Sequence, residues 1–285
     1  MQRTDFRCFH RLRVRWAEVD MQKIVFNAHY LMYIDTAMMD YWRALALPYE
    51  ASMVALGGDI YVKKATLEYH ASAQLEDLLD IGLRCARVGN SSLLLQAGIF
   101  RGEQLLVSGE LVYVFADPAT QTSRPVPEAL RAIFAAYEAG DAMAHAHCGA
   151  WDALGPDAAR VRHAVFIQEQ GIPADIEVDE LDATAVHVVL RNRLGMPVAT
   201  GRLLQHAPGE GRIGRMAVER ALRGGGWGRQ VLRALEDAAR ARGDQHVLLH
   251  AQVQARAFYE RAGYRIHGEP WMEAGIPHIT MQRAL

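Results

Sequence analysis

A chain of 285 residues with a formal net charge of −2 is long enough for two domains. Its near-neutral charge gives no electrostatic reason to expect nucleic acid or a membrane as a partner. The three cysteines are far apart, and the sequence shows neither an apolar run of membrane-spanning length nor a signal-peptide pattern. These features favour a globular protein of a reducing, cytoplasmic compartment.

The first half predicts one long helix followed by consecutive strands. Residues 8–17 indicate a strand, and residues 28–45 then carry apolar side chains at helical spacing until Pro48. A short helix over residues 128–139 closes this half. One helix followed by consecutive strands implies an antiparallel sheet wrapped around that helix. The strands are predicted from runs of Val, Leu, Ile and Tyr at residues 60–70, 78–88, 92–100 and 104–115.

Asp20 is the candidate catalytic residue of this half. It lies seven positions before Asn27, where the long helix begins, so its carboxylate can approach unpaired helix N–H groups. A carbonyl placed against those N–H groups would be polarised, and the carboxylate could attack it or activate a water molecule. The alternative is that Asp20 caps a turn and Asn27 is a simple N-cap.

The segment from Val14 to Tyr30 reads V-x-W-x-E-V-D-x-x-x-x-V-F-N-x-H-Y, and it resembles the signature of hot-dog-fold acyl-CoA thioesterases of the hydroxybenzoyl-CoA type. The resemblance covers residues 8 to about 138. It implies Asp20 as nucleophile or general base and the Asn27 backbone N–H as the donor that polarises the thioester. It also implies a site at a dimer interface, and therefore a homodimer or homotetramer. Many members have H-x-N-Y where this chain has N-A-H-Y, so the side-chain roles of Asn27 and His29 stay open.

Residues 140–156 are small, polar and without periodicity, and we expect a linker there. The linker contains His145, His147 and Cys148. Four ligands at standard zinc spacing are absent, so we predict no metal site.

The second half predicts a mixed α/β unit. Helices are expected at residues 158–169, 230–242 and 254–262. Strands are expected at residues 187–191, 198–206, 212–218 and 246–251 and around 264–267 and 279–282.

A glycine-rich turn from Arg223 to Gly228 lies between the strand at 212–218 and the helix at 230–242. A strand, a glycine turn and a helix N-terminus together form an anion site, because unpaired N–H groups and the helix dipole face the ligand. The spacing is neither that of a dinucleotide fold nor that of a P-loop, since no Lys or Ser/Thr follows Gly228. The turn therefore indicates a phosphorylated ligand other than NAD or ATP.

The pattern Arg223-x-x-Gly226-x-Gly228 resembles the pyrophosphate motif of the GNAT acetyltransferases, and two further elements of that family accompany it. Residues 212–218 resemble the family's splayed strand, and residues 255–264 read A-x-x-F-Y-E-x-x-G-Y. The resemblance implies acetyl-CoA as a co-substrate, with no tightly bound cofactor, and an amine as acceptor. The residues implied to bind acetyl-CoA are Met216, Ala217, Val218, Arg223, Gly224, Gly225, Gly226, Trp227, Gly228, Arg229 and Gln252.

Tyr259 is carried over from this resemblance as the general acid that protonates the departing thiolate. A phenol with a pKa near 10 suits a thiolate of similar basicity, whereas the alternative is plain helix packing beside Phe258. The sequence does not single out the general base as clearly as the general acid, and Glu169 is slightly favoured. The other candidates are Glu177, His187 and His250.

The sequence therefore predicts a two-domain α+β and α/β enzyme. Residues 1–139 form a hot-dog thioesterase domain, residues 140–156 a linker, and residues 157–285 a GNAT N-acetyltransferase domain. The expected activities are hydrolysis of an acyl-CoA and acetyl transfer from acetyl-CoA to a small amine, with no nucleic-acid or membrane partner. The alternative is that the hot-dog domain only binds CoA and forms oligomers, and that the acetyltransferase alone is active.

Overall fold

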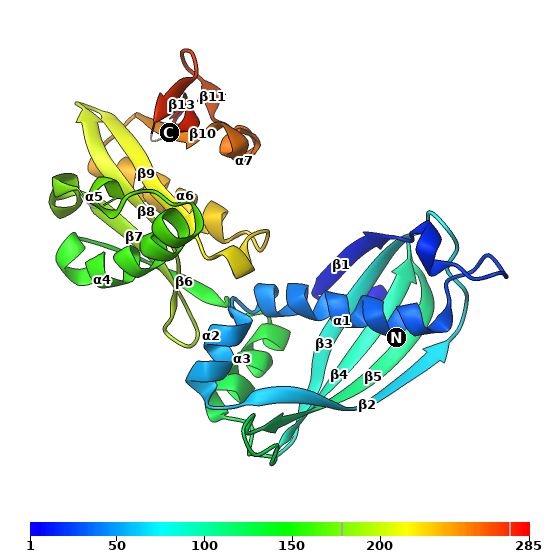
Figure 1. The fold of residues 1–285 in the computed structure, drawn as a ribbon. Helices are drawn as coiled ribbons and strands as arrows, with labels where there is room; N and C mark the ends of the chain where they lie inside the picture. The colour runs from blue at the N-terminus through cyan, green and yellow to red at the C-terminus, as the bar shows by residue number, and fades with distance from the viewer. Residues whose placement is uncertain (178, 274) are drawn as a thin grey trace. The chain divides into compact units, whose positions relative to one another are not determined.

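The computed structural model describes residues 1–177, 179–273 and 275–285. The chain divides into two compact units, Met1–Met143 and Ala144–Leu285 (Figure 1). Within the described residues, no helix is both long and apolar enough to cross a membrane.

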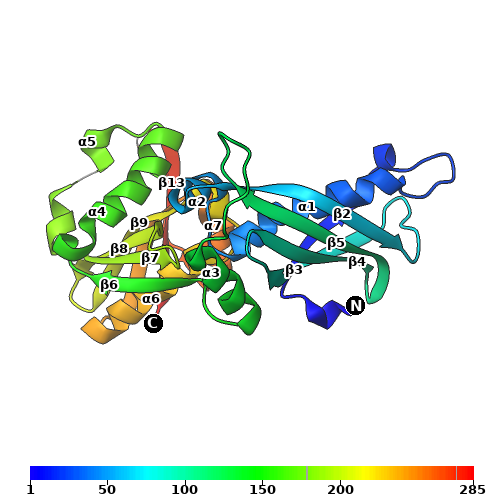
Figure 2. The same cartoon turned by 90° about the horizontal axis from the view of Figure 1, so that it is seen from below.

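The first unit is an antiparallel sheet with the long helix α1 (Asn27–Ala44) across one face (Figures 1 and 2). This architecture confirms the predicted sheet around a helix. Two shorter helices, α2 (Tyr49–Leu56) and α3 (Glu128–Ala139), complete it. In spatial order the strands are β1 (Cys8–Arg13), β3 (Leu78–Val88), β4 (Ser92–Arg101), β5 (Gln104–Ala116) and β2 (Asp59–Tyr69).

Helix α1 buries one face against the sheet because its apolar residues recur at intervals of three and four. Its buried positions run from Tyr30 to Trp42, and Ile34 and Tyr41 are fully covered. Burial of each such side chain contributes about 1.5–3 kcal/mol. The helix ends before Ala46, whose φ is +56°. Pro48 then precedes α2, a helix that the sequence periodicity did not predict.

The predicted linker is wrong for residues 144–156. Residues 144–149 form strand β6 (Ala144–Gly149), which pairs antiparallel with β7 (Val186–Asn192), and α4 (Trp151–Arg162) follows. An edge strand with small side chains lacks the alternation of apolar residues by which a strand is recognised in a sequence. Its stability comes from the backbone hydrogen bonds with the neighbouring strand. Pro156 lies inside α4, where the helix lacks one N–H donor.

The second unit is a mixed sheet with helices packed on it, which confirms the predicted mixed α/β unit. Helix α6 (Trp227–Arg242) packs on one face, and α4 packs on β7 and β8. The helix expected at residues 158–169 is divided: α4 ends at Arg162 and a π-helical segment, η3 (His163–Glu169), continues it. The strands are, in spatial order, β11 (Arg265–Ile266), β13 (Ile276–Ala284), β10 (His246–Gln252), β9 (Glu210–Val218), β8 (Pro197–Ala207), β7 and β6, with β12 (Trp271–Glu273) paired to β13. The short helices α5 (Ala174–Glu177) and α7 (Arg256–Arg261) lie outside this sheet.

Candidate functional site

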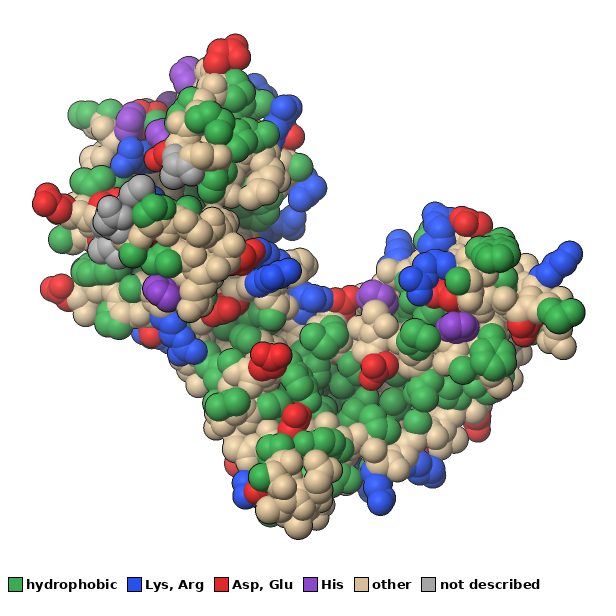
Figure 3. Space-filling model, in the orientation of Figure 1, with side chains coloured by type: hydrophobic (Ala, Val, Ile, Leu, Met, Phe, Trp, Pro, Cys, Tyr) green, Lys and Arg blue, Asp and Glu red, His purple; other side chains and the backbone are tan. Residues whose placement is uncertain are grey.

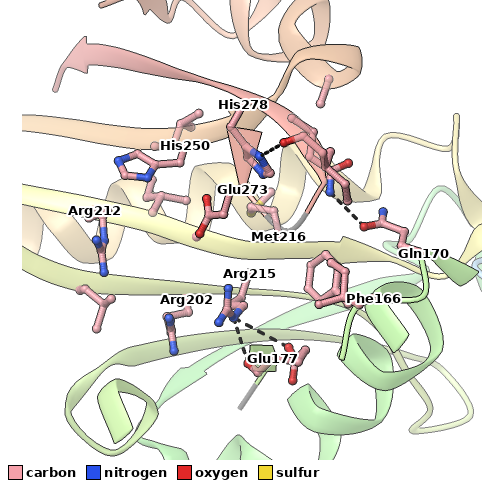
Figure 4. A pocket seen from close by; sticks show the side chains of 18 of the residues that line it. Phe166, Gln170, Glu177, Arg202, Arg212, Arg215, Met216, His250, Glu273 and His278 are labelled. Carbon is pink, nitrogen blue, oxygen red and sulfur yellow. Dashed lines mark hydrogen bonds and ion pairs between the residues drawn. The ribbon is translucent and has the colours of Figure 1, made fainter. Parts of the chain in front are cut away.

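The second unit contains a pocket of about 310 Å³ where β9 and β10 separate (Figure 4). The two strands run parallel and pair only as far as Ile213 and Leu249 among the described residues. Beyond that point β9 continues beside β8 with a bulge, and Arg215 at the bulge has a φ of +50°. A bulge bends and twists its strand, so the ends of β9 and β10 diverge and both line the pocket.

The glycine turn lies between the end of β9 and the start of α6. Gly224 and Gly226 have φ values of +88° and +86°, a conformation that favours glycine. Among the described residues, no backbone acceptor takes the N–H groups of Gly224, Gly226 and Gly228. Space beside Gly226 is open, with no atom within 4 Å of an added Cβ. Free N–H groups at a helix N-terminus with open space before them form an anion site.

The turn is packed closely to the helix that carries Tyr259. A Cβ on Gly228 would lie 3.4 Å from Val218 and 3.5 Å from Phe258. A Cβ on Gly225 would lie 2.5 Å from the Trp227 indole nitrogen, which leaves no room for a side chain. Gly225 is therefore needed for close approach and Gly226 for its conformation, whereas a Cβ on Gly228 would make ordinary van der Waals contacts.

Tyr259 lies on α7 and lines the pocket. Its side chain is 7% exposed and packs against the rings of Phe258 and Tyr264. Burial raises the pKa of the phenol further above 10, because the phenolate would be poorly solvated. The hydroxyl therefore stays protonated at neutral and mildly alkaline pH and can act as a proton donor.

Glu169, the favoured base of the sequence analysis, is a poor base in the structure. Both of its carboxylate oxygens accept hydrogen bonds from Arg223, each at 2.7 Å. These bonds lower the pKa of Glu169, and the residue does not line the pocket. The same contact occupies the Arg223 guanidinium, so this side chain braces the turn against η3.

Two of the other base candidates line the pocket, and one does not. His250 on β10 and Glu177 lie in the pocket wall, whereas His187 is 1% exposed beneath Trp151. The Glu177 carboxylate is occupied by Arg162. Burial and the nearby Arg212 lower the pKa of His250 below 6.5, so the imidazole is neutral at neutral pH and can accept a proton.

A buried network of charges forms one side of the pocket. Arg162 donates to Asp182 at 2.8 Å and also contacts Glu177, and Arg202 donates to Asp182 at 2.7 Å. Arg162 and Asp182 are 1% and 2% exposed. Buried charges are stable only when they are paired and hydrogen-bonded, so this network holds the segment that follows η3 against β8.

Of the remaining residues predicted to bind acetyl-CoA, Met216 and Gln252 line this pocket. Ala217 is buried, and the Val218 carbonyl accepts a hydrogen bond from Arg223 at 3.1 Å. Gln252 lies at the end of β10, where its amide donates to Gln170 at 2.9 Å and accepts from Gln254 at 2.8 Å. Arg229 is exposed on the first turn of α6.

The sequence analysis missed several residues of the pocket wall, because they come from elements far apart in the chain. Phe166 and Gln170 come from the π-helical region and its end, Arg212 from β9, and Glu273 and His278 from the β12–β13 hairpin. One early signal was the motif strand that contains Arg212. Its side chain faces the pocket because strand residues alternate between the two faces of a sheet.

The first unit contains a second pocket, of about 290 Å³, lined by Asp20 and Asn27. One Asp20 oxygen accepts from the Gln22 N–H at 2.7 Å, so Asp20 does cap a turn, as the alternative interpretation proposed. Asn27 is the first residue of α1. Among the described residues, its N–H meets no backbone acceptor, which leaves a donor directed away from the helix.

Glu18, which the sequence analysis gave no role, fixes the segment that carries Asp20. It is 3% exposed and accepts hydrogen bonds from the Arg15 backbone at 2.7 Å and from the Tyr33 hydroxyl at 2.8 Å. Burial opposes its ionisation, but the bonds from Arg15 and Tyr33 outweigh burial and lower the pKa of Glu18. The Glu18 carbonyl also accepts the Phe26 N–H at 2.9 Å. This bond ties the Asp20 turn to the start of α1.

Comparison with known proteins identifies one family for each unit. A model of the GNAT acetyltransferase domain matches residues 156–285, and a model of the thioesterase-like superfamily matches residues 14–134. An uncharacterized N-acetyltransferase of Bacillus subtilis, YjcF, is 39% identical over 128 residues, which are 45% of this chain and 90% of the relative.

Two solved structures are similar to parts of the chain. An acyl-CoA N-acyltransferase from Pseudomonas aeruginosa is 35% identical, with a TM-score of 0.45, and the match covers 50% of this chain and 99% of that chain. A thioesterase complexed with coenzyme A and Zn from Thermus thermophilus is 24% identical, with a TM-score of 0.43, and the match covers 48% of this chain and 98% of that chain.

Proposed function

The chain belongs to the GNAT acetyltransferases through its second unit and to the thioesterase-like superfamily through its first, and we propose that it is a bifunctional acyl-CoA enzyme. The first unit hydrolyses an acyl-CoA thioester, and the second transfers an acetyl group from acetyl-CoA to an amine. One observation carries the proposal. In each unit, the acid or base residue of the family motif lines a pocket, and a helix of the same unit begins with N–H groups that meet no backbone acceptor among the described residues.

In the second unit, the amine nitrogen attacks the acetyl carbonyl, and the C–S bond of acetyl-CoA breaks. Tyr259 donates its proton to the departing thiolate, and the free thiol leaves. His250 accepts the proton that the amine loses, directly or through water, and both residues exchange protons with solvent before the next turnover. The N–H groups of Gly224, Gly226 and Gly228, which meet no backbone acceptor among the described residues, hold the pyrophosphate. The raised pKa of Tyr259 and the lowered pKa of His250 support these roles.

In the first unit, the thioester carbonyl oxygen lies against the Asn27 N–H, which stabilises negative charge on it. Asp20 acts as nucleophile or as general base. As a nucleophile it forms an acyl-enzyme that water hydrolyses, and as a base it removes a proton from the attacking water. In both routes the C–S bond breaks, and the products are the free acid and CoA.

The proposal is tested by offering the full chain a panel of acyl-CoA thioesters with and without amines. Free thiol measured without amine reports hydrolysis, and the acetylated amine measured by mass spectrometry reports transfer. Hydrolysis and transfer with different acyl preferences are the expected result. Transfer with no hydrolysis of any thioester would favour a first unit that only binds CoA and forms oligomers. The absence of both activities would contradict the whole proposal.

Replacing Gly226 by Ala is expected to weaken acetyl-CoA binding by about tenfold, because a side chain disfavours the left-handed φ that aims the N–H groups at the pyrophosphate. The dissociation constant measured by calorimetry checks this. Gly243 at the other end of α6 is the matched control, with a φ of +95° and no atom within 4 Å of an added Cβ. Gly243→Ala carries similar strain and should leave the affinity unchanged. An equal loss of affinity in both variants would indicate that the substitution acts by weakening helix α6.

We also propose that the chain forms a homodimer or homotetramer through the first unit. Strand β2 is an edge of the sheet, and Val62 and Tyr69 on it are 54% and 52% exposed. Hydrophobic side chains gather on the face of this unit shown in Figure 3. An unpaired edge with exposed apolar side chains favours association. Tyr69 also lines the Asp20 pocket, so a partner there would help to enclose it. Light scattering should give two or four times the chain mass of 31.7 kDa, and a single chain mass would contradict the proposal.

A further inference from the structure

Most charged side chains in the wall of the second unit's pocket have an ion partner. Glu177 pairs with Arg162. Asp179 pairs with Arg202 at 2.6 Å and with Arg215 at 3.1 Å. These pairs neutralise one another, so they leave little net field for a ligand.

Arg212 and Glu273 are the two exceptions, since neither has an ion partner within the described part of the chain. Arg212 is half-buried on β9, and Glu273 is exposed at the end of β12. In Figure 4, Arg212 lies beside His250, and Glu273 lies between Arg212 and Met216. A half-buried guanidinium without a counter-charge has lost part of its hydration, so an anionic ligand gains more there than at the surface.

We propose that the amine acceptor also carries a carboxylate, which Arg212 binds, while Glu273 attracts the amino end. This inference rests on the proposed acetyl transfer, and it names the class of acceptor. A guanidinium can bind a carboxylate through two parallel hydrogen bonds. Three carboxylates already line the pocket, so a monoanion is tolerated better than a phosphate dianion.

The strand geometry separates the two ends of the acceptor. Arg212 and Met216 are four residues apart on β9, which is at most about 13 Å of extended strand. Met216 lies where the strands have diverged, and Arg212 lies where they still pair. The acceptor therefore has several bonds between its carboxylate and the reacting nitrogen, as in an ω-amino acid.

The test uses ω-amino acids from 3-aminopropanoate to 8-aminooctanoate, each compared with the amide that replaces its carboxylate. Binding to the full chain saturated with CoA is measured by calorimetry, and acetylation by mass spectrometry. The best acid is expected to bind about tenfold or more tightly than its amide. Arg212→Gln should abolish this preference. Arg233→Gln, a change at an exposed position of α6 outside the pocket wall, should retain it.

The outcomes separate this inference from the proposed function. Equal binding of acids and amides, no binding of either, or an unchanged preference in Arg212→Gln would overturn the carboxylate site. Tighter binding of an aminoalkylphosphonate than of the matching acid would overturn the preference for a monoanion. Arg212-dependent binding without acetylation of any acceptor would support the site and contradict the transferase activity.

Discussion

The Asp20→Asn variant is expected to lose about 10²–10⁴-fold in kcat for acyl-CoA hydrolysis and to retain acetyl transfer. The amide has nearly the shape of the carboxylate and can still accept the Gln22 N–H, so the turn that positions it survives. It lacks the negative charge that a nucleophile or general base needs. Release of free thiol from the best acyl-CoA substrate measures hydrolysis, and acetylated amine measures transfer in the same preparation.

Asp117 offers a matched control for this variant in the same unit. Its carboxylate also accepts the N–H of the residue two positions later, Ala119, at 2.8 Å, and it lies outside the pocket wall. Asp117→Asn should therefore hydrolyse acyl-CoA at the wild-type rate. Full hydrolysis by Asp20→Asn would remove Asp20 from the mechanism. A comparable loss in both variants would indicate a general effect of weakened turns.

The Tyr259→Phe variant is expected to lose about 10²-fold or more in kcat for acetyl transfer, with little change in KM for acetyl-CoA. Only the hydroxyl is removed, and the ring keeps its packing against Phe258 and Tyr264. The proton is needed when the thiolate departs, so the loss falls on the chemical step. Steady-state kinetics with a saturating amine measure it, and hydrolysis by the first unit should be unchanged.

Tyr264 is the control for a buried tyrosine of the same region. Its hydroxyl donates to Glu236 at 3.0 Å, so Tyr264→Phe should lower stability by about 1 kcal/mol without a specific loss of kcat.

The pH profile of acetyl transfer adds a second readout. Burial raises the pKa of Tyr259 and lowers that of His250. The loss of transferase activity at low pH therefore reports protonation of His250, and activity falls as the pH drops through the pKa of His250. A Tyr259→Phe enzyme with normal kcat would exclude the phenol as the acid.

Local features of the fold were predictable because they depend on neighbours in sequence. The periodicity of α1 and the boundaries of β3 and α3 follow from side-chain alternation and breakers, and the structure confirms them. Helix α2 and strand β6 were missed. The edge strand β6 is stabilised by its ladder with β7, and no property of its own six residues reveals that partner.

The residues of the candidate sites also fall into those that local sequence predicts and those that depend on distant contacts. Asp20, Asn27, Tyr259 and the glycine turn were found from motifs, in which the residues that act together lie within a few positions of one another. The base could not be chosen, since its state depends on distant partners. Glu169 and Arg223 are 54 residues apart, and their contact changes Glu169 from the favoured base into a brace for the turn.

The sequence by itself determined the two families, the motif residues and the order of most elements, because backbone conformation, capping and periodicity are local properties. Only the tertiary structure decided where β9 and β10 separate, which charges in the pocket are paired, and that Arg212 and Glu273 have no ion partner within the described residues. Charge pairing and burial depend on contacts between segments far apart in the chain. The free energies of ion pairing and burial therefore depend on the folded sheet, which brings those segments together.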